Sequence, residues 1–135
     1  MRSDLLPASI AIALSASLGA VPVSVSAQSM PGSDAGKVLF ESKCAACHSL
    51  DASRVGPLLR SVVGRKVASV AGYEYSDALR HVNGRWDSRR LEMWLQDPQS
   101  IAPGTKMAFS LPSATERSAV VQYLASTSAA GSVKR

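Results

Sequence analysis

The segment ESKCAACHSL, residues 41–50, concentrates the side chains of this sequence that could bond to a cofactor or bind a metal ion. Cys44 and Cys47 are the only cysteines, and His48 is one of two histidines. The C-x-x-C-H pattern is typical of c-type haem attachment, in which both thiols form thioethers and the histidine ligates iron. Two intervening residues let both sulfurs reach one edge of the macrocycle, and the next residue brings an imidazole over the metal.

Three other chemistries use the same residue types. A thioredoxin-like redox pair expects a strand–helix–strand context, which this sequence does not predict. A structural zinc site takes four protein ligands, and His81 is the only remaining Cys or His. A disulfide suits an exported protein but gives His48 no task. The pattern therefore favours one haem c, attached through Cys44 and Cys47.

The second axial position of such an iron decides its chemistry. Met107 lies in IAPGTKMAF, where Pro103 and Gly104 break any helix and a loop can carry a thioether to the iron. Met93 lies inside a helical pattern, where methionine commonly fills a core. The residues by themselves leave several choices, including a sixth ligand of another type or none. The side chains considered are Met30, Met93, Met107, His81 and the lysines.

Residues 1–27 have the order of a cleavable secretory signal peptide: Arg2 near the start, an apolar stretch, then VSA at 25–27. The apolar core at 5–18 is shorter than the roughly 20 residues that a spanning helix needs, so no stable membrane insertion is expected. The remainder, residues 28–135, fits a single domain. The net charge of +5 suits acidic partners. Nucleic acid is not expected, because no basic run exceeds two residues.

The pattern of apolar residues and caps predicts an all-α fold. Loops at 50–75 and 98–112 are long for a compact domain unless they wrap a ligand. Residues from about 126 to 135 are rich in small side chains and are expected to form a flexible tail. The predicted helices are 35–47 after caps at Ser33 and Asp34, a weaker one at 77–82 after Ser76, 88–97 after Asp87 or Ser88, and a fourth from the Ser113–Glu116 capping box through Leu124.

From Asp34 to Ala125 the chain resembles class I c-type cytochromes, close to the mitochondrial cytochrome c type and its bacterial relatives. The resemblance joins, in the family's order, GKVLFESKCAACHSL, VGPLLRSVVGRK, AGYEYSDAL, Trp86, DPQSIAPGTKMAF and ERSAVVQYL. It implies three main helices, short helices and long loops wrapped around one covalently bound haem.

The resemblance also assigns roles. Met107 becomes the sixth ligand with Thr105 nearby, and the carbonyl of Pro57 accepts the Nδ1 proton of His48. Gly36 and Phe40 would pack against Tyr123. Buried carboxylates need partners, and the residues implied to hold a haem propionate are Arg65, Tyr75 and Trp86. The full cofactor-binding set is Cys44, Cys47, His48, Met107, Pro57, Arg65, Tyr75, Trp86 and Thr105, with His48 and Met107 on the metal.

The sequence departs from the family pattern in three places. Leu79 replaces a polar amide, and Trp94 replaces a tyrosine that bonds toward the ligating sulfur. Both changes are expected to remove polar groups, giving a drier pocket and an altered potential. The segment SLDASRV at 49–55 is shorter than in mitochondrial proteins, so the rim there should differ.

These features together predict an exported, periplasmic one-electron carrier and a monomer, not an enzyme, because six-coordinate iron leaves no substrate site. Its expected partners are redox proteins with acidic docking surfaces, such as an oxidase, a cytochrome complex or a dehydrogenase, toward which Lys43 and Lys106 would steer. Two alternatives stay open. One is a peroxidase-like or gas-binding protein in which Met107 is loose, and the other is a subunit docked permanently to a larger enzyme.

Overall fold

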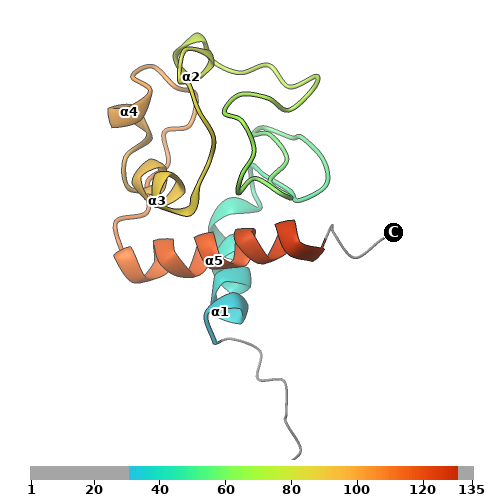
Figure 1. The fold of residues 1–135 in the computed structure, drawn as a ribbon. Helices are drawn as coiled ribbons and strands as arrows, with labels where there is room; N and C mark the ends of the chain where they lie inside the picture. Colours follow the sequence, from blue (N-terminus) through green and yellow to red (C-terminus); the bar gives the residue numbers. More distant parts are fainter. Residues whose placement is uncertain (1–30, 131–135) are drawn as a thin grey trace, which may run out of the picture.

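The computed structural model describes residues 31–130, and the predicted signal peptide at 1–27 lies outside them. Within the described part the only β pairing is an isolated antiparallel bridge between Lys66 and Arg85, so the predicted all-α class is confirmed. Figure 1 shows the helices joined by long loops. In chain order they are α1 Pro31–Leu39, the π-helical η1 Phe40–Cys44, α2 Asp77–Arg80, α3 Ser88–Gln96, α4 Pro98–Ile101 and α5 Ala114–Ala130.

The first helix begins earlier than predicted, at Pro31, so Ser33 and Asp34 lie in its first turn and not before it. Proline is favoured at the first helical position, because its fixed φ suits the helix and its missing N–H is not needed there. The carboxylate of Asp34 then lies near the positive end of the helix dipole. The predicted cap positions were therefore wrong, although the helix itself is present.

The α-helical hydrogen bonding ends at Leu39, well before residue 47, where the sequence pattern placed the end of the helix. The chain continues as a wider π turn, Phe40–Cys44, in which the N–H of Ala45 donates to the carbonyl of Phe40 at 3.0 Å. Such turns occur frequently at functional sites. Here the turn delivers Cys44, the first residue of the C-x-x-C-H motif.

Three predicted helix caps are present. The Ser76 hydroxyl accepts from the N–H of Leu79 at 3.2 Å, and Asp87 Oδ1 accepts from Arg90 at 2.7 Å. Ser113 accepts from the N–H of Glu116 at 3.3 Å. Each bond satisfies an amide that has no partner inside its helix, an effect worth about 1 kcal/mol.

A short helix, α4, lies where the sequence predicted only loop. Asp97 Oδ1 accepts from the N–H of Gln99 at 3.0 Å, and Pro98 occupies the first helical position. Asp97 also ends α3, because its N–H donates to the carbonyl of Met93. Asp97 thus ends one helix and caps the next. The second helix is missed when Pro98 is interpreted only as a helix breaker.

The core is built on α5, which packs against both α1 and α3. Figure 1 shows α1 crossing α5 near its middle. At the crossing a Cβ on Gly36 would overlap the carbonyl oxygen of Ala119 and lie 2.7 Å from Tyr123 Cβ. The rings of Phe40 and Tyr123 lie 5.6 Å apart between centroids. The predicted close approach of the first and last helices is therefore present.

The last helix also corrects the predicted tail. α5 continues to Ala130 and does not end near residue 126. Thr127 is buried, and its hydroxyl donates to the carbonyl of Leu124 at 2.7 Å. The small residues near the end of the chain predicted a frayed tail. A threonine whose hydroxyl bonds to a carbonyl of its own helix can instead be buried, so the helix continues through it.

Replacing Gly36 tests the helix crossing. Gly36→Val is expected to lower the free energy of unfolding of the haem-loaded protein by about 2–3 kcal/mol, because α1 and α5 must separate to admit the side chain. Chemical denaturation followed by circular dichroism measures this loss. Ala35→Val, at the exposed neighbouring position, is the matched control and should cost about 0.5 kcal/mol. Equal losses in the two variants would contradict the close contact.

Candidate haem-binding site

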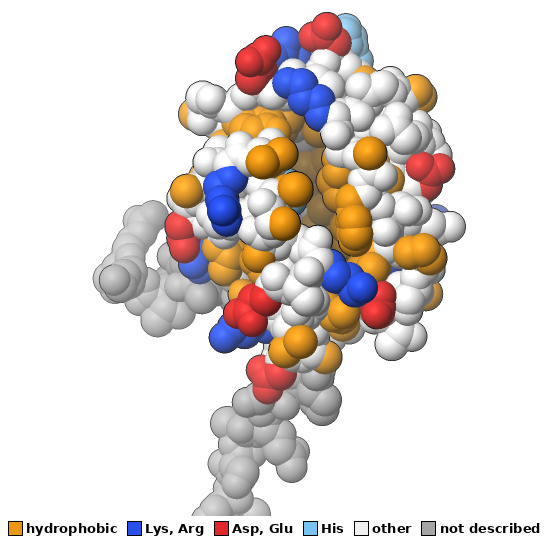
Figure 2. Space-filling view, turned by 180° about the vertical axis from the view of Figure 1, so that it is seen from behind, with side chains coloured by type: hydrophobic (Ala, Val, Ile, Leu, Met, Phe, Trp, Pro, Cys, Tyr) orange, Lys and Arg blue, Asp and Glu red, His pale blue; other side chains and the backbone are white. Residues whose placement is uncertain are grey.

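The helices and loops surround a cavity of about 390 Å³, within the usual range of about 300–1,000 Å³ for ligand pockets. Figure 2 shows its opening as a hollow lined by hydrophobic side chains, with Lys and Arg side chains nearby. The structure brings all nine predicted cofactor-binding residues to this cavity. They are Cys44, Cys47, His48, Pro57, Arg65, Tyr75, Trp86, Thr105 and Met107.

The C-x-x-C-H motif forms a tight turn at the end of η1. The carbonyl of Cys44 accepts from the N–H of Cys47 at 3.1 Å and from that of His48 at 2.9 Å. The next loop is tied to this turn, because Gly56 N–H donates to the carbonyl of Cys47 at 2.8 Å. Arg54 adds a bond from its Nη1 to the carbonyl of Ala45 at 3.1 Å. The two cysteines and the histidine are thereby presented from one short turn.

The two thiols differ in their surroundings. Cys44 is partly buried, and Cys47 is exposed; neither forms a disulfide. Burial, reinforced by the charge of Cys47 and opposed by Lys43, raises the pKa of the Cys44 thiol to about 11. At neutral pH a free Cys44 is therefore a protonated thiol, which suits a sulfur that lies against an apolar group.

His48 is held by a hydrogen bond between its Nδ1 and the carbonyl oxygen of Pro57, 2.7 Å apart. A carbonyl only accepts, so Nδ1 carries the proton and Nε2 keeps a free lone pair. Burial lowers the pKa of His48, against the opposing effect of the Pro57 bond, and this favours the neutral ring. A neutral imidazole with Nδ1–H bonded to a carbonyl is the usual state of a metal-binding histidine.

Gly56 allows this arrangement. A Cβ at Gly56 would overlap the His48 ring, with Nδ1 only 2.6 Å away. The ring therefore lies directly on the backbone of Gly56 while its Nδ1 reaches Pro57. No sequence pattern predicts this role for Gly56, because only the fold brings its loop onto the ring.

Met107 lies on a loop after α4, and its sulfur accepts a hydrogen bond from Trp94 Nε1 at 3.1 Å. Trp94 belongs to α3 and is 6% exposed. The prediction that this tryptophan removes a polar group near the methionine was wrong. Its indole N–H supplies a donor to the same sulfur, because the larger ring extends from α3 as far as the loop.

Leu79, a second departure from the family pattern, lies in the wall of the cavity. Leu79 is 8% exposed and lines the cavity with a purely apolar side chain. The other buried side chains that line the cavity come from the loop after η1, from α3 and from α5. They include Val62, Leu91, Leu95, Val120 and Leu124.

Hydrogen-bond donors gather at the predicted propionate end. Arg65 donates through Nη2 to the carbonyl of Leu58 at 2.8 Å and through Nη1 to that of Arg60 at 3.2 Å. Burial lowers the pKa of Arg65, with an opposing effect from Tyr75, but a guanidinium stays charged in proteins. The backbone N–H of Trp86 donates to the carbonyl of Arg65 at 2.8 Å and keeps the two residues together.

These groups retain donors for another partner. The Tyr75 hydroxyl accepts from the N–H of Val70 at 3.2 Å, which leaves its own proton to donate. Trp86 is 7% exposed and lines the same cavity, and its indole has one N–H to donate. Donors of this kind on the wall of a cavity suit a carboxylate.

The rival metal ligands lie elsewhere. His81 is exposed, its Nδ1 lies 2.7 Å from the carbonyl of Asp77, and it does not line the cavity. Met93 is 51% exposed on α3 and does not line it either. Met30 lies outside the described residues. Between residues 31 and 130, no three His, Cys, Asp or Glu side chains form a group that could hold a metal ion.

Tyr73, to which no sequence pattern assigned a role, bonds to the segment 49–55, where the rim of the site was expected to differ. Its hydroxyl donates to the carbonyl of Val55 at 2.7 Å, and burial raises the pKa of this phenol. Its ring meets Tyr75 edge-on, with centroids 4.7 Å apart. The bond joins loop residues that are 18 positions apart, so no sequence pattern indicated it.

The residues present fit a haem c. Two thiols and an imidazole come from one turn, a thioether from the Met107 loop, and apolar walls from the rest of the fold. The donors of Arg65, Tyr75 and Trp86 suit the group's carboxylates. A histidine together with a methionine is one of the ligand sets that proteins use to hold haem iron.

Comparison with known proteins agrees with this chemistry. The Cytochrome c family model matches residues 33–128. Cytochrome c-type cyt cy of Rhodobacter capsulatus is 44% identical over 92 residues, covering 67% of this chain and 46% of that protein. Cytochrome c of Gibberella zeae is 39% identical over 93 residues, covering 66% and 88%. The structure of cytochrome cH from Methylobacterium extorquens aligns with a TM-score of 0.66 and 38% identity, covering 70% and 97%.

The chain therefore belongs to the cytochrome c family. Members of this family bind haem c covalently and carry electrons. At the level of the family, this chain is therefore an electron carrier and not an enzyme. The chain matches about half the length of the Rhodobacter capsulatus relative. None of the helices between residues 31 and 130 has the length and hydrophobicity that crossing a bilayer requires.

Replacing Gly56 tests the support of His48. In the haem-loaded protein, Gly56→Ala should displace the ring from Pro57 and speed solvent exchange of the His48 Nδ1 proton roughly five- to tenfold, the equivalent of one lost hydrogen bond. NMR of ¹⁵N-labelled protein measures this rate. In the control Gly72→Ala, the added Cβ meets nothing within 4 Å, although the φ of +74° is strained. That variant should exchange as the unmodified protein does, whereas unchanged exchange in Gly56→Ala would refute the contact.

Proposed function

We propose that this protein carries single electrons with a haem whose iron is bound by His48 and Met107. A bound haem would supply one-electron redox chemistry at its iron. Cys44 and Cys47 attach the group, and the apolar walls exclude water. The observation that carries the proposal is that one cavity brings the neutral, Pro57-bonded His48 together with the Trp94-bonded Met107.

Both side chains are suited to stay bound in either oxidation state. His48 keeps the Nε2 lone pair as its only basic position, and Pro57 fixes the ring orientation. Met107 offers a thioether, which raises the potential relative to a second imidazole. A hydrogen bond from Trp94 draws electron density from the same sulfur and adds to this effect. With His48 and Met107 as its two protein ligands, the iron would have no position left for a substrate.

Export is part of the proposal. Residues 1–27 have a signal-peptide order, and the chain resembles bacterial cytochromes such as that of Rhodobacter capsulatus. We therefore place the mature protein, residues 28–135, in the periplasm. It would carry electrons there between respiratory or dehydrogenase partners.

The proposed partner surface surrounds the cavity opening. Lys43 and Lys106 line the cavity and are exposed, and the Lys106 ammonium donates to the carbonyl of Glu74 at 3.1 Å. Val55 and Phe109, which are 75% and 41% exposed, also line it. An apolar rim with cations at its edge suits an acidic redox protein, because the charges guide approach and the apolar residues exclude water on contact.

Spectroscopy of Met107→Ala tests the ligand assignment. The unmodified ferric protein should be low-spin with a methionine-to-iron charge-transfer band and bind carbon monoxide poorly when reduced. Met107→Ala should lose the band, bind carbon monoxide readily and have a lower midpoint potential. Met93→Ala, which changes an exposed methionine on α3, is the control and should match the unmodified protein. A band that survives in Met107→Ala would show that another residue is the ligand.

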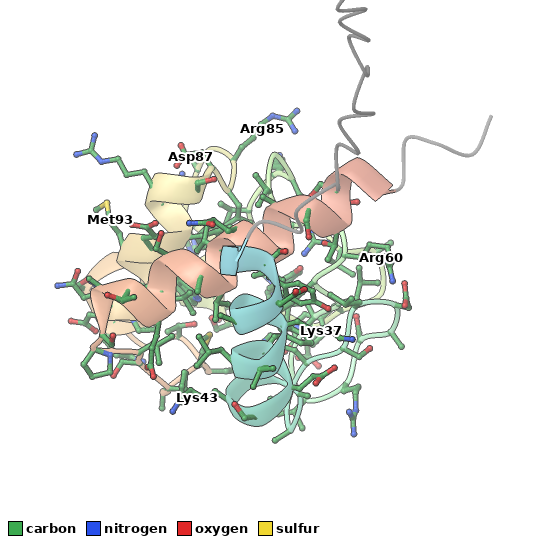
Figure 3. All side chains as sticks on the ribbon, turned by 90° about the horizontal axis from the view of Figure 1, so that it is seen from below. Lys37, Lys43, Arg60, Arg85, Asp87 and Met93 are labelled. Atoms are coloured by element: carbon green, nitrogen blue, oxygen red, sulfur yellow. The ribbon has the colours of Figure 1, made fainter. Side chains whose placement is uncertain are left out.

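Charge reversal tests the partner surface. Lys43→Glu with Lys106→Glu should slow electron transfer to a purified acidic oxidase about tenfold at low ionic strength and reduce the salt dependence of that rate. Stopped-flow kinetics measure it. The control pair Lys37→Glu with Arg85→Glu changes net charge equally at residues outside the cavity lining. Figure 3 shows Arg85 on the opposite edge of the molecule from Lys43. Equal slowing by both pairs would indicate general charge attraction and no defined surface.

A further inference from the structure

The loop that carries Met107 is held by one side-chain amide from α4. Gln99 Oε1 accepts from the N–H of Gly104 at 2.9 Å. Gln99 Nε2 donates to the carbonyl of Thr105 at 3.1 Å and to that of Met107 at 3.4 Å. Three backbone groups of one four-residue turn thus converge on a single side chain.

These contacts need a primary amide. Glutamine has an acceptor oxygen and two N–H donors on one planar group, and all three bonds use them in the matching sense. A glutamate at this position accepts from Gly104 but cannot donate to the two carbonyls. A lysine donates but cannot accept. The bonding therefore depends on the chemistry of residue 99 and not only on its size.

Other side chains do not replace Gln99 in this role. In the described part of the chain, it is the only side chain that bonds to the backbone of residues 104–107. The far end of the loop is fixed separately: the N–H of Leu111 donates to the carbonyl of Leu95 at 2.6 Å, and Arg117 Nη1 donates to the carbonyl of Leu111 at 2.8 Å. Residues 108–110, between the two attachments, are exposed.

The backbone of Gln99 is itself well anchored. Its N–H donates to Asp97, and Pro98, just before it, is among the most buried side chains of the protein. Gly104 has a φ of +91°, a left-handed conformation that glycine adopts without strain. The anchored helix α4 and this glycine turn together direct the backbone of residues 104–107 toward the Gln99 amide.

We propose that Gln99 is a positioning residue that keeps the Met107 sulfur on the iron. The inference rests on the proposed His48–Met107 ligation. Gln99 does not line the cavity and reaches the metal only through the loop backbone. Loss of its bonds raises the fraction of molecules in which the loop is open, and any external ligand binds in proportion to that fraction.

Imidazole titration of the ferric, haem-loaded protein tests this role. Gln99→Ala should bind imidazole about tenfold more tightly in apparent affinity, because hydrogen bonds that close the loop are lost. Gln99→Glu should behave likewise, since it keeps length and one acceptor but loses both donors. Ser100→Ala is the control in the same helix, because the Ser100 hydroxyl bonds only to the carbonyl of Asp97. It should match the unmodified protein.

The same titration on Met107→Ala separates the two proposals. If Met107→Ala binds imidazole no more tightly than the unmodified protein, the ligand assignment fails. If Met107→Ala binds more tightly while Gln99→Ala and Gln99→Glu match the unmodified protein, Met107 remains the ligand and the positioning role of Gln99 is overturned. An equal gain in Ser100→Ala would also overturn it, because α4 and not the amide would then hold the loop. Should Gln99→Ala not fold, the Gln99→Glu result decides.

Discussion

The close crossing of α1 and α5 at Gly36 is the constraint on which the rest of the site depends. The absence of a Cβ lets the two helix backbones meet, and Phe40 then packs on Tyr123. The π turn that follows is thereby fixed against α5, and with it the first thiol of the motif. Because α3 packs on the same helix, the methionine side of the cavity is positioned by the element that positions the cysteine side.

The two sides of the cavity are supported by different means. His48 is held by backbone alone, with Gly56 beneath its ring and the Pro57 carbonyl at Nδ1. Met107 is held by side chains, with the Trp94 indole at its sulfur and the Gln99 amide at its loop. The support of His48 therefore requires that residue 56 has no side chain, whereas the support of Met107 depends on the identity of two side chains.

Several sequence expectations failed for reasons that particular residues explain. The chain was expected to change from helix to loop at Pro98, yet with Asp97 as cap this proline starts another helix. Small residues after 125 suggested a tail, but Thr127 is buried and satisfies its own hydroxyl within α5. Trp94 was expected to remove a donor and supplies one. In each case the residue type permits two roles, and the surrounding packing selects between them.

The sequence by itself determined the helical class, three of the helix caps and the attachment chemistry, because these depend on residues close together in the chain. A cap needs a serine or aspartate three positions from an amide, and C-x-x-C-H is complete within five residues. Only the tertiary structure decided which loop residues support them. Gly56 beneath His48, Tyr73 on Val55 and Gln99 at the Met107 loop depend on how the loops pack. Loop packing follows from burial across the whole domain, which local residue patterns do not encode.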